Sequence, residues 1–299
     1  MDSPVILVVD DEPLNLDIIE EFLTGKGEAY VVEKANDGIE AMEKLEANPE
    51  KFDVVLLDRM MPRMSGMEVL ENMNSHADLK YIPVILQTAK VSKDDVLEGL
   101  KAGAYYYLTK PFTSDILHSV VKTAVKDRGF NKALMASLNV TKSSAKLINN
   151  ANFQFRNLKD VTAVSSLLAC TCDEPEKIAM GLSELMINAV EHGNLEIGYE
   201  EKSRLRQIGQ WESEIAKRLE FPENINKVAT IEVINTPECV SFTITDQGNG
   251  FDWSEYMEFD TSRVMDNHGR GIAMANQLYF SMLKYEGTGN KVTVTVQKQ

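Results

Sequence analysis

Short apolar runs alternate with helix-like stretches over the first 125 residues of the chain. Each run ends in polar residues and is followed by a segment whose apolar positions recur every three or four residues. The runs are VILVVDD (5–11), AYVVEKAND (29–37), FDVVLLDRMMP (52–62), IPVILQTAK (82–90) and AYYYLTKPF (104–112). Continuous apolar strands separated by helices are typical of a parallel sheet covered on both faces. The pattern predicts a five-stranded, doubly wound α/β domain over residues 1–125.

A different pattern begins near Phe153. A short strand-like run, FQFR (153–156), is followed by helix-like stretches at 160–172 and 174–194 and by a third, highly charged one at 199–220. Most of the strand-like runs come late, and they are KVATIEVIN (227–235), CVSFTITD (239–246), SMLKYEG (281–287) and NKVTVTVQ (290–297). Helices early and strands late favour an α+β two-layer sandwich with an antiparallel or mixed sheet. Residues 153–299 are therefore expected to form a second domain.

The stretch between these two patterns, residues 126–152, is expected to be a helical linker. Apolar residues lie near a spacing of three or four, but Asp127, Asn131 and Thr141 interrupt it, and Gly129 is a point at which the helix is expected to break. Two arrangements stay open: a helix that packs on its own domains, or a long helix that pairs with a second copy in a homodimer. His118, just before the linker, is interpreted as an ordinary residue of the first domain's last helix.

Length and charge limit the classes of function. A chain of 299 residues predicts two domains. The formal net charge of −15 argues against nucleic acid as the main partner and against an anionic membrane surface, because both require a basic surface. No apolar run approaches the roughly 18–20 residues of a membrane span. The three cysteines cannot all pair within the chain, so free thiols in a reducing cytoplasm are expected.

Polar side chains stand at the carboxyl ends of the predicted strands of the first domain. They are Asp10, Asp11, Asp58, Thr88 and Lys110. In parallel α/β sheets the chemistry lies beyond these ends, so the five side chains are expected to converge. Clustered carboxylates are held most readily by a hard divalent cation, which also neutralises charge on a transferring phosphoryl group. Helix capping would explain one such acid, but not five groups at matching positions.

This arrangement resembles the receiver domain of two-component response regulators, a flavodoxin-like fold, and the match covers residues ~3–125. The resemblance implies that Asp58 accepts a phosphoryl group from a cognate histidine kinase. It also implies that Mg²⁺ is bound by Asp11, Asp58 and the carbonyl of Met60, with Asp10 behind them.

The same resemblance assigns a switch to the last two strands. Thr88 and Lys110 would hold the phosphoryl oxygens, and Tyr107 would be the aromatic residue that turns inwards after phosphorylation. The Lys-Pro pair at 110–111 is expected to have a cis peptide bond.

In the second domain, SELMINAVEHGN (183–194) places polar residues on one side of an otherwise apolar helix. At about 100° per residue, the residues that share this side are Lys177, Gly181, Glu184, Asn188 and Glu191. A solvated face is the ordinary interpretation, but glycine and an amide are poor choices for the interior of an exposed helix. The stripe is therefore interpreted as facing a ligand.

Two glycine clusters follow, DQGNGFD (246–252) at a strand end and HGRGIAMANQLY (268–279) at a helix start. Both are places where backbone amides can approach phosphates. Together with the Asn188 helix they resemble the GHKL-type ATP-binding fold, or Bergerat fold, shared by histidine kinases, gyrase, the Hsp90 chaperone and the anti-sigma-factor serine kinases. The match covers residues ~153–299.

This second resemblance implies ATP and Mg²⁺ as ligands. Asn188 would hold the Mg²⁺ on the triphosphate, and Asp246 would accept a hydrogen bond from the adenine amino group. The residues that would open the lid or cradle the phosphates are Gly248, Gly250, Gly269, Arg270 and Gly271.

Within this superfamily the sequence looks most like the anti-sigma-factor serine kinases. The lid between Phe251 and His268 is short, and no phosphoacceptor-histidine helix precedes the domain. Glu184, four residues before Asn188, corresponds to the general base of those kinases. We therefore expect an ATP-dependent serine/threonine protein kinase, controlled by phosphorylation of Asp58. Its substrate would be an anti-sigma-factor antagonist in a bacterial partner-switching pathway.

The alternative is a binding protein that uses ATP to sequester a sigma factor or an antagonist, with little phosphoryl transfer. Glu184 favours the kinase, because sequestration needs no base. The charged segment 199–225 is longer than a minimal kinase needs and is interpreted as a docking element. Trp211 and Trp253 are candidates for exposed contacts, although core packing is the more frequent fate of tryptophan.

Overall fold

The computed structural model describes residues 3–25, 30–88, 99, 102–138, 145–257 and 271–298. The chain divides into two compact units, and the division falls between Phe130 and Asn131. Each unit is described by itself below. None of the helices among these residues is long and apolar enough to cross a membrane.

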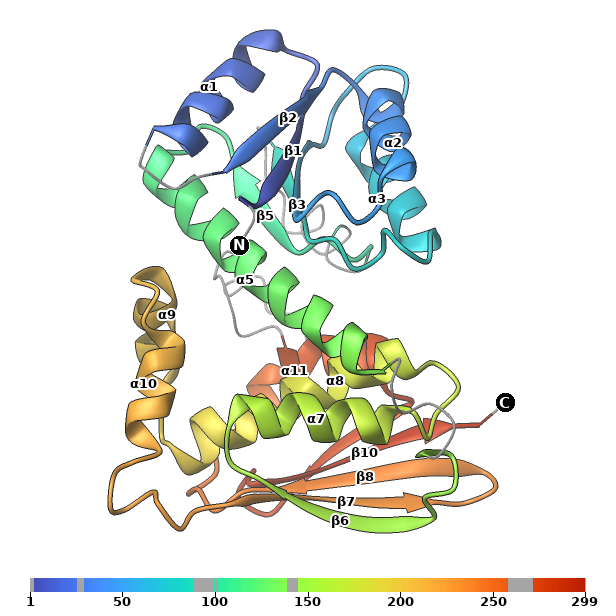
Figure 1. The fold of residues 1–299 in the computed structure, drawn as a ribbon, viewed down its shortest axis with the longest axis vertical. Coiled ribbons are helices and arrows are strands. Elements are labelled where there is room, and N and C mark those ends of the chain that lie inside the picture. Colours follow the sequence, from blue (N-terminus) through green and yellow to red (C-terminus); the bar gives the residue numbers. More distant parts are fainter. Residues whose placement is uncertain are drawn as a thin grey trace. The chain divides into compact units, whose positions relative to one another are not determined.

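The N-terminal unit is built on a parallel sheet (Figure 1). Its strands are β1 (Val5–Val9), β2 (Val31–Ala35), β3 (Val54–Asp58), β4 (Val84–Thr88) and β5 (Tyr106–Thr109). They lie in the order β2-β1-β3-β4-β5, and every neighbouring pair is parallel. All residues of β3 and β4 are buried, as expected of strands covered on both faces. The predicted doubly wound α/β fold is confirmed.

Helices cover this sheet on both faces. Apolar residues of α1 (Pro13–Thr24) and α5 (Ser114–Leu138) share one buried cluster with β1, β3 and β5. Figure 1 shows α2 (Gly38–Ala47) and α3 (Gly66–Ser75) together on the opposite face. The helix expected after β4 falls largely outside the described residues.

Side-chain caps define where α2 and α3 begin. Asp37 accepts hydrogen bonds from the backbone N–H groups of Ile39 and Glu40 at the start of α2. Ser65 and Glu68 form a reciprocal capping box at the start of α3. Each cap satisfies amide donors that have no partner within the helix. Local sequence therefore sets both helix starts, and α3 starts only eight residues beyond Asp58.

The helix α5 continues without interruption through Gly129, so the expected break at this residue is wrong. A glycine costs a helix about 1 kcal/mol relative to alanine, which packing on either side can outweigh. Val120 and Ala124 are buried in the N-terminal unit, and Leu134 and Leu138 are buried in the C-terminal unit.

His118 also lies on α5, where its Nε2 is 2.5 Å from the carbonyl oxygen of Phe22. The side chain is buried. These contacts match the interpretation of His118 as an ordinary residue of this helix.

The C-terminal unit has an antiparallel sheet in the order β6-β7-β8-β10-β9. The strands are β6 (Asn150–Phe155), β7 (Ala229–Asn235), β8 (Cys239–Thr245), β9 (Met282–Glu286) and β10 (Lys291–Gln297). In β7 and β8 buried residues alternate with more exposed ones, so one face forms the core.

Helices lie over that inner face (Figure 1). They are α7 (Leu158–Ala169), α8 (Pro175–Asn188), the π-helical turn η1 (Ala189–Asn194), α11 (Gly271–Met274) and the π-helical turn η3 (Ala275–Tyr279). The end of α5 also packs here, because Ser166 of α7 donates a hydrogen bond to the carbonyl of Leu134. The predicted α+β two-layer sandwich is confirmed.

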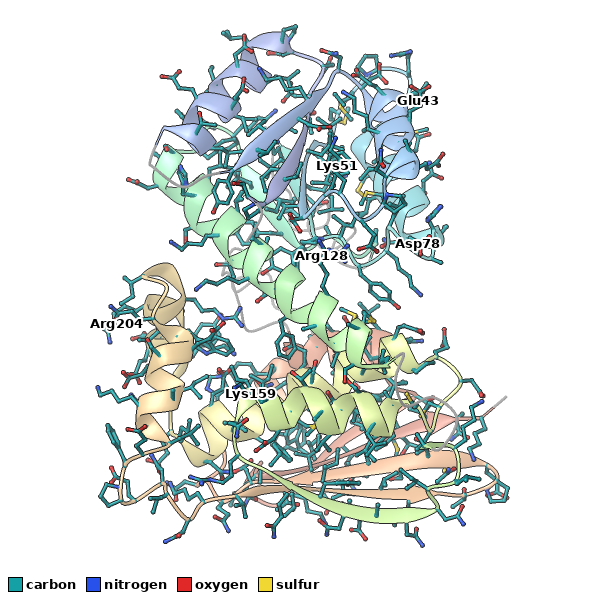
Figure 2. The ribbon with its side chains drawn as sticks, in the orientation of Figure 1. Glu43, Lys51, Asp78, Arg128, Lys159 and Arg204 are labelled. Carbon is teal, nitrogen blue, oxygen red and sulfur yellow. The ribbon has the colours of Figure 1, made fainter. Side chains whose placement is uncertain are left out.

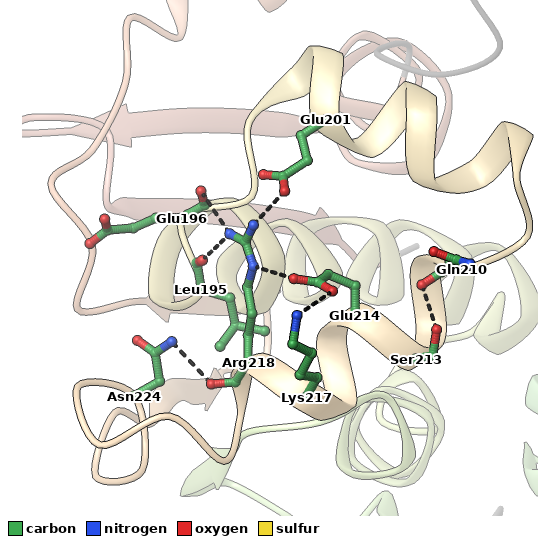
Figure 3. A network of polar contacts seen from close by, with 9 residues as sticks. All are labelled: Leu195, Glu196, Glu201, Gln210, Ser213, Glu214, Lys217, Arg218 and Asn224. Atoms are coloured by element: carbon green, nitrogen blue, oxygen red, sulfur yellow. Dashed lines mark hydrogen bonds and ion pairs between the residues drawn. The ribbon is translucent and has the colours of Figure 1, made fainter.

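The charged segment 199–225 forms a helical hairpin of α9 (Tyr199–Gln207) and α10 (Trp211–Arg218). Figure 3 shows how Arg218 of α10 ties this hairpin to the chain that follows η1. Its guanidinium donates to the carbonyl of Leu195 over 3.0 Å and pairs with Glu201 of α9 and Glu214 of α10. The hairpin is thus anchored to the helical layer of its own unit.

Candidate functional site

Three of the strand-end residues predicted to converge in the N-terminal unit lie in direct contact. Lys110, just after β5, places its Nζ 2.5 Å from Oδ1 of Asp58 and 2.6 Å from Oδ2 of Asp10. Asp10 is almost wholly buried. Burial lowers the pKa of Lys110, but hydrogen bonds and charge from the two carboxylates outweigh it and raise this pKa above its ordinary value. Lys110 is therefore a cation held against Asp58.

The second oxygen of Asp58 is also held in place. The backbone N–H of Met60 donates to Oδ2 of Asp58 over 2.8 Å. Gly66, the first residue of α3, passes so close to the carbonyl of Asp58 that any Cβ there would overlap it. Asn15 of α1 in turn donates to Oδ1 of Asp10 over 3.0 Å. Sequence reasoning missed Gly66 and Asn15, although a glycine that begins a helix soon after the predicted phosphoacceptor was a usable signal.

The remaining members of the proposed Mg²⁺ set lie at the surface. Asp11 and Met60 are exposed, and Met60 presents 77% of its area to solvent. Within the described residues, no three acidic, histidine or cysteine side chains converge closely enough to form a metal site by themselves. The predicted set needs only two carboxylates and one backbone carbonyl, and these oxygen donors suit a hard cation that keeps several waters.

The predicted switch residues lie at the ends of β4 and β5. Thr88 is buried at the end of β4, and the backbone N–H of Lys110 donates to its carbonyl over 2.8 Å. Tyr107 is 1% exposed, so its ring lies inside the unit. A Cβ at Gly99 would overlap the ring of Tyr107, and the glycine therefore makes room for the inward position. The Lys110–Pro111 bond is cis, as expected.

In the C-terminal unit, Glu184 and Asn188 stand one turn apart at the end of α8. Glu184 is exposed and Asn188 is half-buried. Gly271, the first residue of α11, lies so close to the carboxylate of Glu184 that a Cβ there would overlap Oε2. The structure therefore brings Glu184 next to part of the second glycine cluster. Gly269 and Arg270 of that cluster lie outside the described residues.

The polar stripe of α8 does not face a ligand along its whole length, so that interpretation needs correction. A Cβ at Gly181 would crowd Phe280 and Tyr279, which means that the glycine serves helix packing. Glu191 is wholly buried and accepts a hydrogen bond from Trp211 Nε1 over 2.7 Å. The helix changes to a π-helical turn at Ala189. The rotation of about 100° per residue, which placed Glu191 on the same side as Asn188, holds only for an α-helix and does not apply at Glu191.

Asp246 follows β8, is half-buried and lies close to glycine backbone. Gly248 N–H donates to its Oδ1 over 2.8 Å. A Cβ at Gly193 would crowd the Asp246 carboxylate, and one at Gly248 would overlap the backbone of Gly193. Burial raises the pKa of Asp246 to about 6, against which the Gly248 hydrogen bond acts only in part. Gly193 was missed by sequence reasoning, since only the fold brings it to Asp246.

Beyond Asp246 the chain enters an aromatic cluster of Phe251, Trp253, Tyr256 and Tyr285. Trp253 stacks on Tyr285 with 5.8 Å between ring centroids, and Phe251 meets Tyr285 edge-on at 5.4 Å. Gly250, with φ of +81°, and Gly289, with φ of +98°, allow the close backbone turns beneath these rings. Burial, together with the charge of Asp246, raises the pKa of Tyr285. Trp253 is thus a packing residue, stacked on Tyr285.

Comparison with known proteins identifies both units. Residues 6–122 match the response regulator receiver domain, and residues 154–296 match the histidine kinase-like ATPase domain. The chain is a response regulator with a histidine kinase-like ATPase domain.

Relatives of the receiver domain include the chemotaxis protein CheY1 of Helicobacter pylori strain 26695. It is 39% identical over 112 residues, which are 38% of this chain and 89% of CheY1. The uncharacterized transcriptional regulatory protein YrkP of Bacillus subtilis is 38% identical over 117 residues, or 39% of this chain and 47% of YrkP. A solved structure of Vibrio cholerae chemotaxis protein CheY4 covers 38% of this chain and 91% of its own, with 32% identity and a TM-score of 0.35.

In the receiver domain the matched region contains every predicted strand-end residue, and Asp10, Asp58 and Lys110 are in contact. In the ATPase domain the matched region contains Asn188 with Glu184 and Asp246 with its neighbouring glycines. These two groups are joined by η1, whose Gly193 touches Asp246 and which begins directly after Asn188. The candidate nucleotide site is therefore centred on the end of α8, η1 and the end of β8.

Proposed function

We propose that this response regulator is an ATP-dependent serine/threonine protein kinase whose activity is controlled by phosphorylation of Asp58. A cognate histidine kinase in the cytoplasm supplies the phosphoryl group. The substrate is a serine or threonine hydroxyl of an anti-sigma-factor antagonist, in a partner-switching pathway that ends at a sigma factor.

The proposal for the receiver domain rests on the Asp58–Lys110 contact. An Asp58 oxygen attacks the phosphorus of the phosphohistidine, an O–P bond forms, and the N–P bond to the donor histidine breaks. Lys110, which is 2.5 Å from Asp58, can follow a phosphoryl oxygen and neutralise part of its charge. Asp11, Asp58 and the Met60 carbonyl would hold Mg²⁺, which supplies further charge neutralisation.

The proposal for the ATPase domain rests mainly on the position of Glu184. It is exposed, lies one turn before Asn188 and adjoins Gly271 at the start of α11. A protein hydroxyl reaching Glu184 can pass its proton to the carboxylate while its oxygen attacks the γ-phosphorus. The new O–P bond replaces the bond to the β-phosphate, and ADP leaves. Asp246 would accept a hydrogen bond from the adenine amino group, and Asn188 would hold the Mg²⁺ that neutralises charge on the triphosphate.

Asp246 supports a nucleotide on electrostatic grounds. Its carboxylate has been taken partly out of water, and burial raises its pKa. Only Oδ1 of Asp246 accepts in the described hydrogen bonds, from the backbone N–H of Gly248, so the site favours a ligand that brings another donor. The adenine amino group is such a donor, and the backbone of Gly193 packs directly against the carboxylate and against Gly248.

One experiment tests kinase activity and its control together. The full chain is incubated with γ-labelled ATP, Mg²⁺ and the anti-sigma-factor antagonist encoded next to it, with and without beryllofluoride as a phosphoryl mimic. We expect label on a serine or threonine of the antagonist and a roughly 5–150-fold change in rate with beryllofluoride, the span of typical allosteric couplings. The change should disappear in Asp58→Asn.

Two other outcomes would redirect the proposal. ATP-dependent binding of the antagonist or of a sigma factor without label transfer would identify a sequestering module instead of a kinase. Equal rates with and without beryllofluoride, at saturating ATP and antagonist, would mean that the receiver domain does not regulate the ATPase domain.

A further inference from the structure

Glu191 is a wholly buried carboxylate in η1 that takes no part in the proposed chemistry. Its oxygens contact Lys202 of α9 and Trp211 of α10, the latter through a 2.7 Å hydrogen bond from Nε1. The Arg206 guanidinium lies over the Trp211 ring, 5.0 Å from its centroid. Glu191, Lys202, Arg206 and Trp211 are referred to below as the Glu191 cluster. This cluster joins η1 to both helices of the hairpin.

The charge of Glu191 is maintained despite its burial. Burial raises the pKa of Glu191, but the charges of Lys202, His192 and Arg206 and the Lys202 hydrogen bond outweigh it, so the pKa lies below its ordinary value. Lys202 is itself buried, with 9% of its side chain exposed. Removing one partner of such a pair leaves the other charge buried and uncompensated. The contact therefore resists small displacements of either element.

The turn η1 (Ala189–Asn194), which contains Glu191, also shapes the candidate nucleotide site. Gly193 packs its backbone against the Asp246 carboxylate. Asn194 is buried, and its Oδ1 accepts a 2.8 Å hydrogen bond from the backbone N–H of Gln247. Asn188 directly precedes η1. A shift of η1 relative to β8 would therefore change the contacts around Asp246.

A second anchor keeps the hairpin close to η1. Arg218 donates to the carbonyls of Leu195 and Glu196, the two residues after η1 (Figure 3). The hairpin therefore contacts this part of the chain at two places. Lys202 and Trp211 contact Glu191 within η1, and Arg218 contacts the carbonyls just beyond η1. A π-helical turn is rare and is frequently found at functional sites. Contacts from outside η1 hold this turn at both places.

We propose that Glu191 is a positioning residue through which the α9–α10 hairpin sets the geometry of the nucleotide site. The inference rests on the proposed ATP site at Asp246 and adds an element that controls it. Coupling between two sites is reciprocal, so ATP binding at Asp246 must also change the surroundings of the cluster residues on the hairpin, Lys202, Arg206 and Trp211. Trp211 is placed to report that change.

Trp211 fluorescence tests this reciprocity in the full chain. The chain has two tryptophans, so Trp253→Phe leaves Trp211 as the single emitter. ATP with Mg²⁺ should change Trp211 emission, with a midpoint equal to the Kd that calorimetry gives for the same Trp253→Phe protein. Adding Asp246→Asn should move both midpoints to higher ATP concentration together.

Substitutions in the cluster test the effect in the other direction. Glu191→Gln and Lys202→Gln each remove one buried charge and should weaken ATP binding by roughly 5–150-fold, the range of typical couplings. Arg204→Gln is the matched control, because Arg204 is an exposed cation on the same helix as Lys202 (Figure 2). It should change ATP affinity less than twofold. Near-ultraviolet circular dichroism establishes that each variant is folded.

The outcomes separate this inference from the proposed function. A Trp211 signal that does not respond to ATP, in a protein that binds ATP by calorimetry, would overturn the inference and leave the ATP site standing. Unchanged affinity in folded Glu191→Gln would do the same. If Glu191→Gln does not fold, the Trp211 titration decides alone. Absence of ATP binding by the unmodified chain would overturn the proposed function and this inference together.

Discussion

Asp58 and Asp246 are both carboxylates at the end of a strand, but the two domains surround them differently. Asp58 has the Lys110 ammonium 2.5 Å away and the Met60 amide on its other oxygen. Asp246 has a backbone amide from Gly248 and the close backbone of Gly193. Among the described residues, no cation contributes to the shift of its pKa, which burial raises to about 6.

The two environments of Asp58 and Asp246 suit two different kinds of ligand. A carboxylate beside a fixed cation is prepared for a reaction in which negative charge moves, because the ammonium can follow that charge. A half-buried carboxylate without a cation is prepared for a neutral hydrogen-bond donor, because in the described hydrogen bonds of Asp246 only Oδ1 accepts, from Gly248. The first environment suits phosphoryl transfer and the second suits the adenine amino group, as proposed above. The following predictions test this contrast, from the largest expected effect to the smallest.

The first prediction concerns the charged site. Asp58→Asn should accept no phosphoryl group from acetyl phosphate, because an amide is not a nucleophile towards phosphorus under these conditions. Intact-mass spectrometry of the full chain measures the modification. Asp78→Asn is the control, since Asp78 is an exposed acid of the same domain (Figure 2) and should leave phosphorylation unchanged. A phosphorylated Asp58→Asn protein would show that another residue is the acceptor.

The second prediction separates catalysis from binding in the ATPase domain. Glu184→Ala should lower phosphoryl transfer to the antagonist by roughly 10²–10⁴-fold, the usual contribution of a general base, with ATP affinity nearly unchanged. Initial rates and calorimetric titration measure the two quantities. Glu174→Ala, which removes an exposed acid just before the first turn of α8, should change neither. Loss of ATP affinity as large as that of Asp246→Asn would make Glu184 a structural residue.

The third prediction concerns Asp246, the proposed acceptor of the adenine amino group. Asp246→Asn should weaken ATP binding by about 1–3 kcal/mol, the cost of leaving a buried polar partner unsatisfied. Asp252→Asn is the matched control, because Asp252 is an exposed acid six residues further on whose carboxylate bonds only to Ser254 in the described hydrogen bonds. Calorimetry should show wild-type affinity for Asp252→Asn. Equal losses in both variants would mean that charge in the loop, not a specific acceptor, governs binding.

The fourth prediction is the pKa of Asp246 itself. In the nucleotide-free chain its carboxyl resonance should titrate near pH 6, above the ordinary value of 3.8, because burial disfavours the charged form. Since the folded-state pKa is raised, the contribution of this group to folded stability is complete below about pH 3.8 and is lost as the pH rises through about 6. Carbon-13 NMR measures the titration.

Asp252 is the internal control for that titration. Hydrogen bonds from Ser254 lower its pKa, so its resonance should titrate below 3.8 in the same spectra. An Asp246 resonance that titrates with ordinary acids would contradict the buried, cation-free environment on which the contrast with Asp58 depends.

The receiver domain was predictable in more detail than the ATPase domain. Five apolar runs between helices imply a parallel sheet, and a parallel sheet brings its carboxyl strand ends together. The Asp10–Asp58–Lys110 contact follows from that topology, although the residues are far apart in sequence. In the ATPase domain, the α+β order and the glycine clusters could also be predicted, because helix starts and tight turns have local signatures.

The chain by itself therefore determined which elements form and which polar residues stand at their ends, because periodicity and capping act over a few residues. Only the tertiary structure decided where the polar stripe of α8 ends. Phe280 and Tyr279 cover Gly181, and Lys202 with Trp211 bury Glu191, although 100° periodicity placed both beside Asn188. Likewise Gly193 meets Asp246 only because η1 and β8 are neighbours in the fold. Such contacts depend on packing between segments that are distant in sequence and on the change from α- to π-helical geometry. The spacing of residues along one helix predicts neither of them.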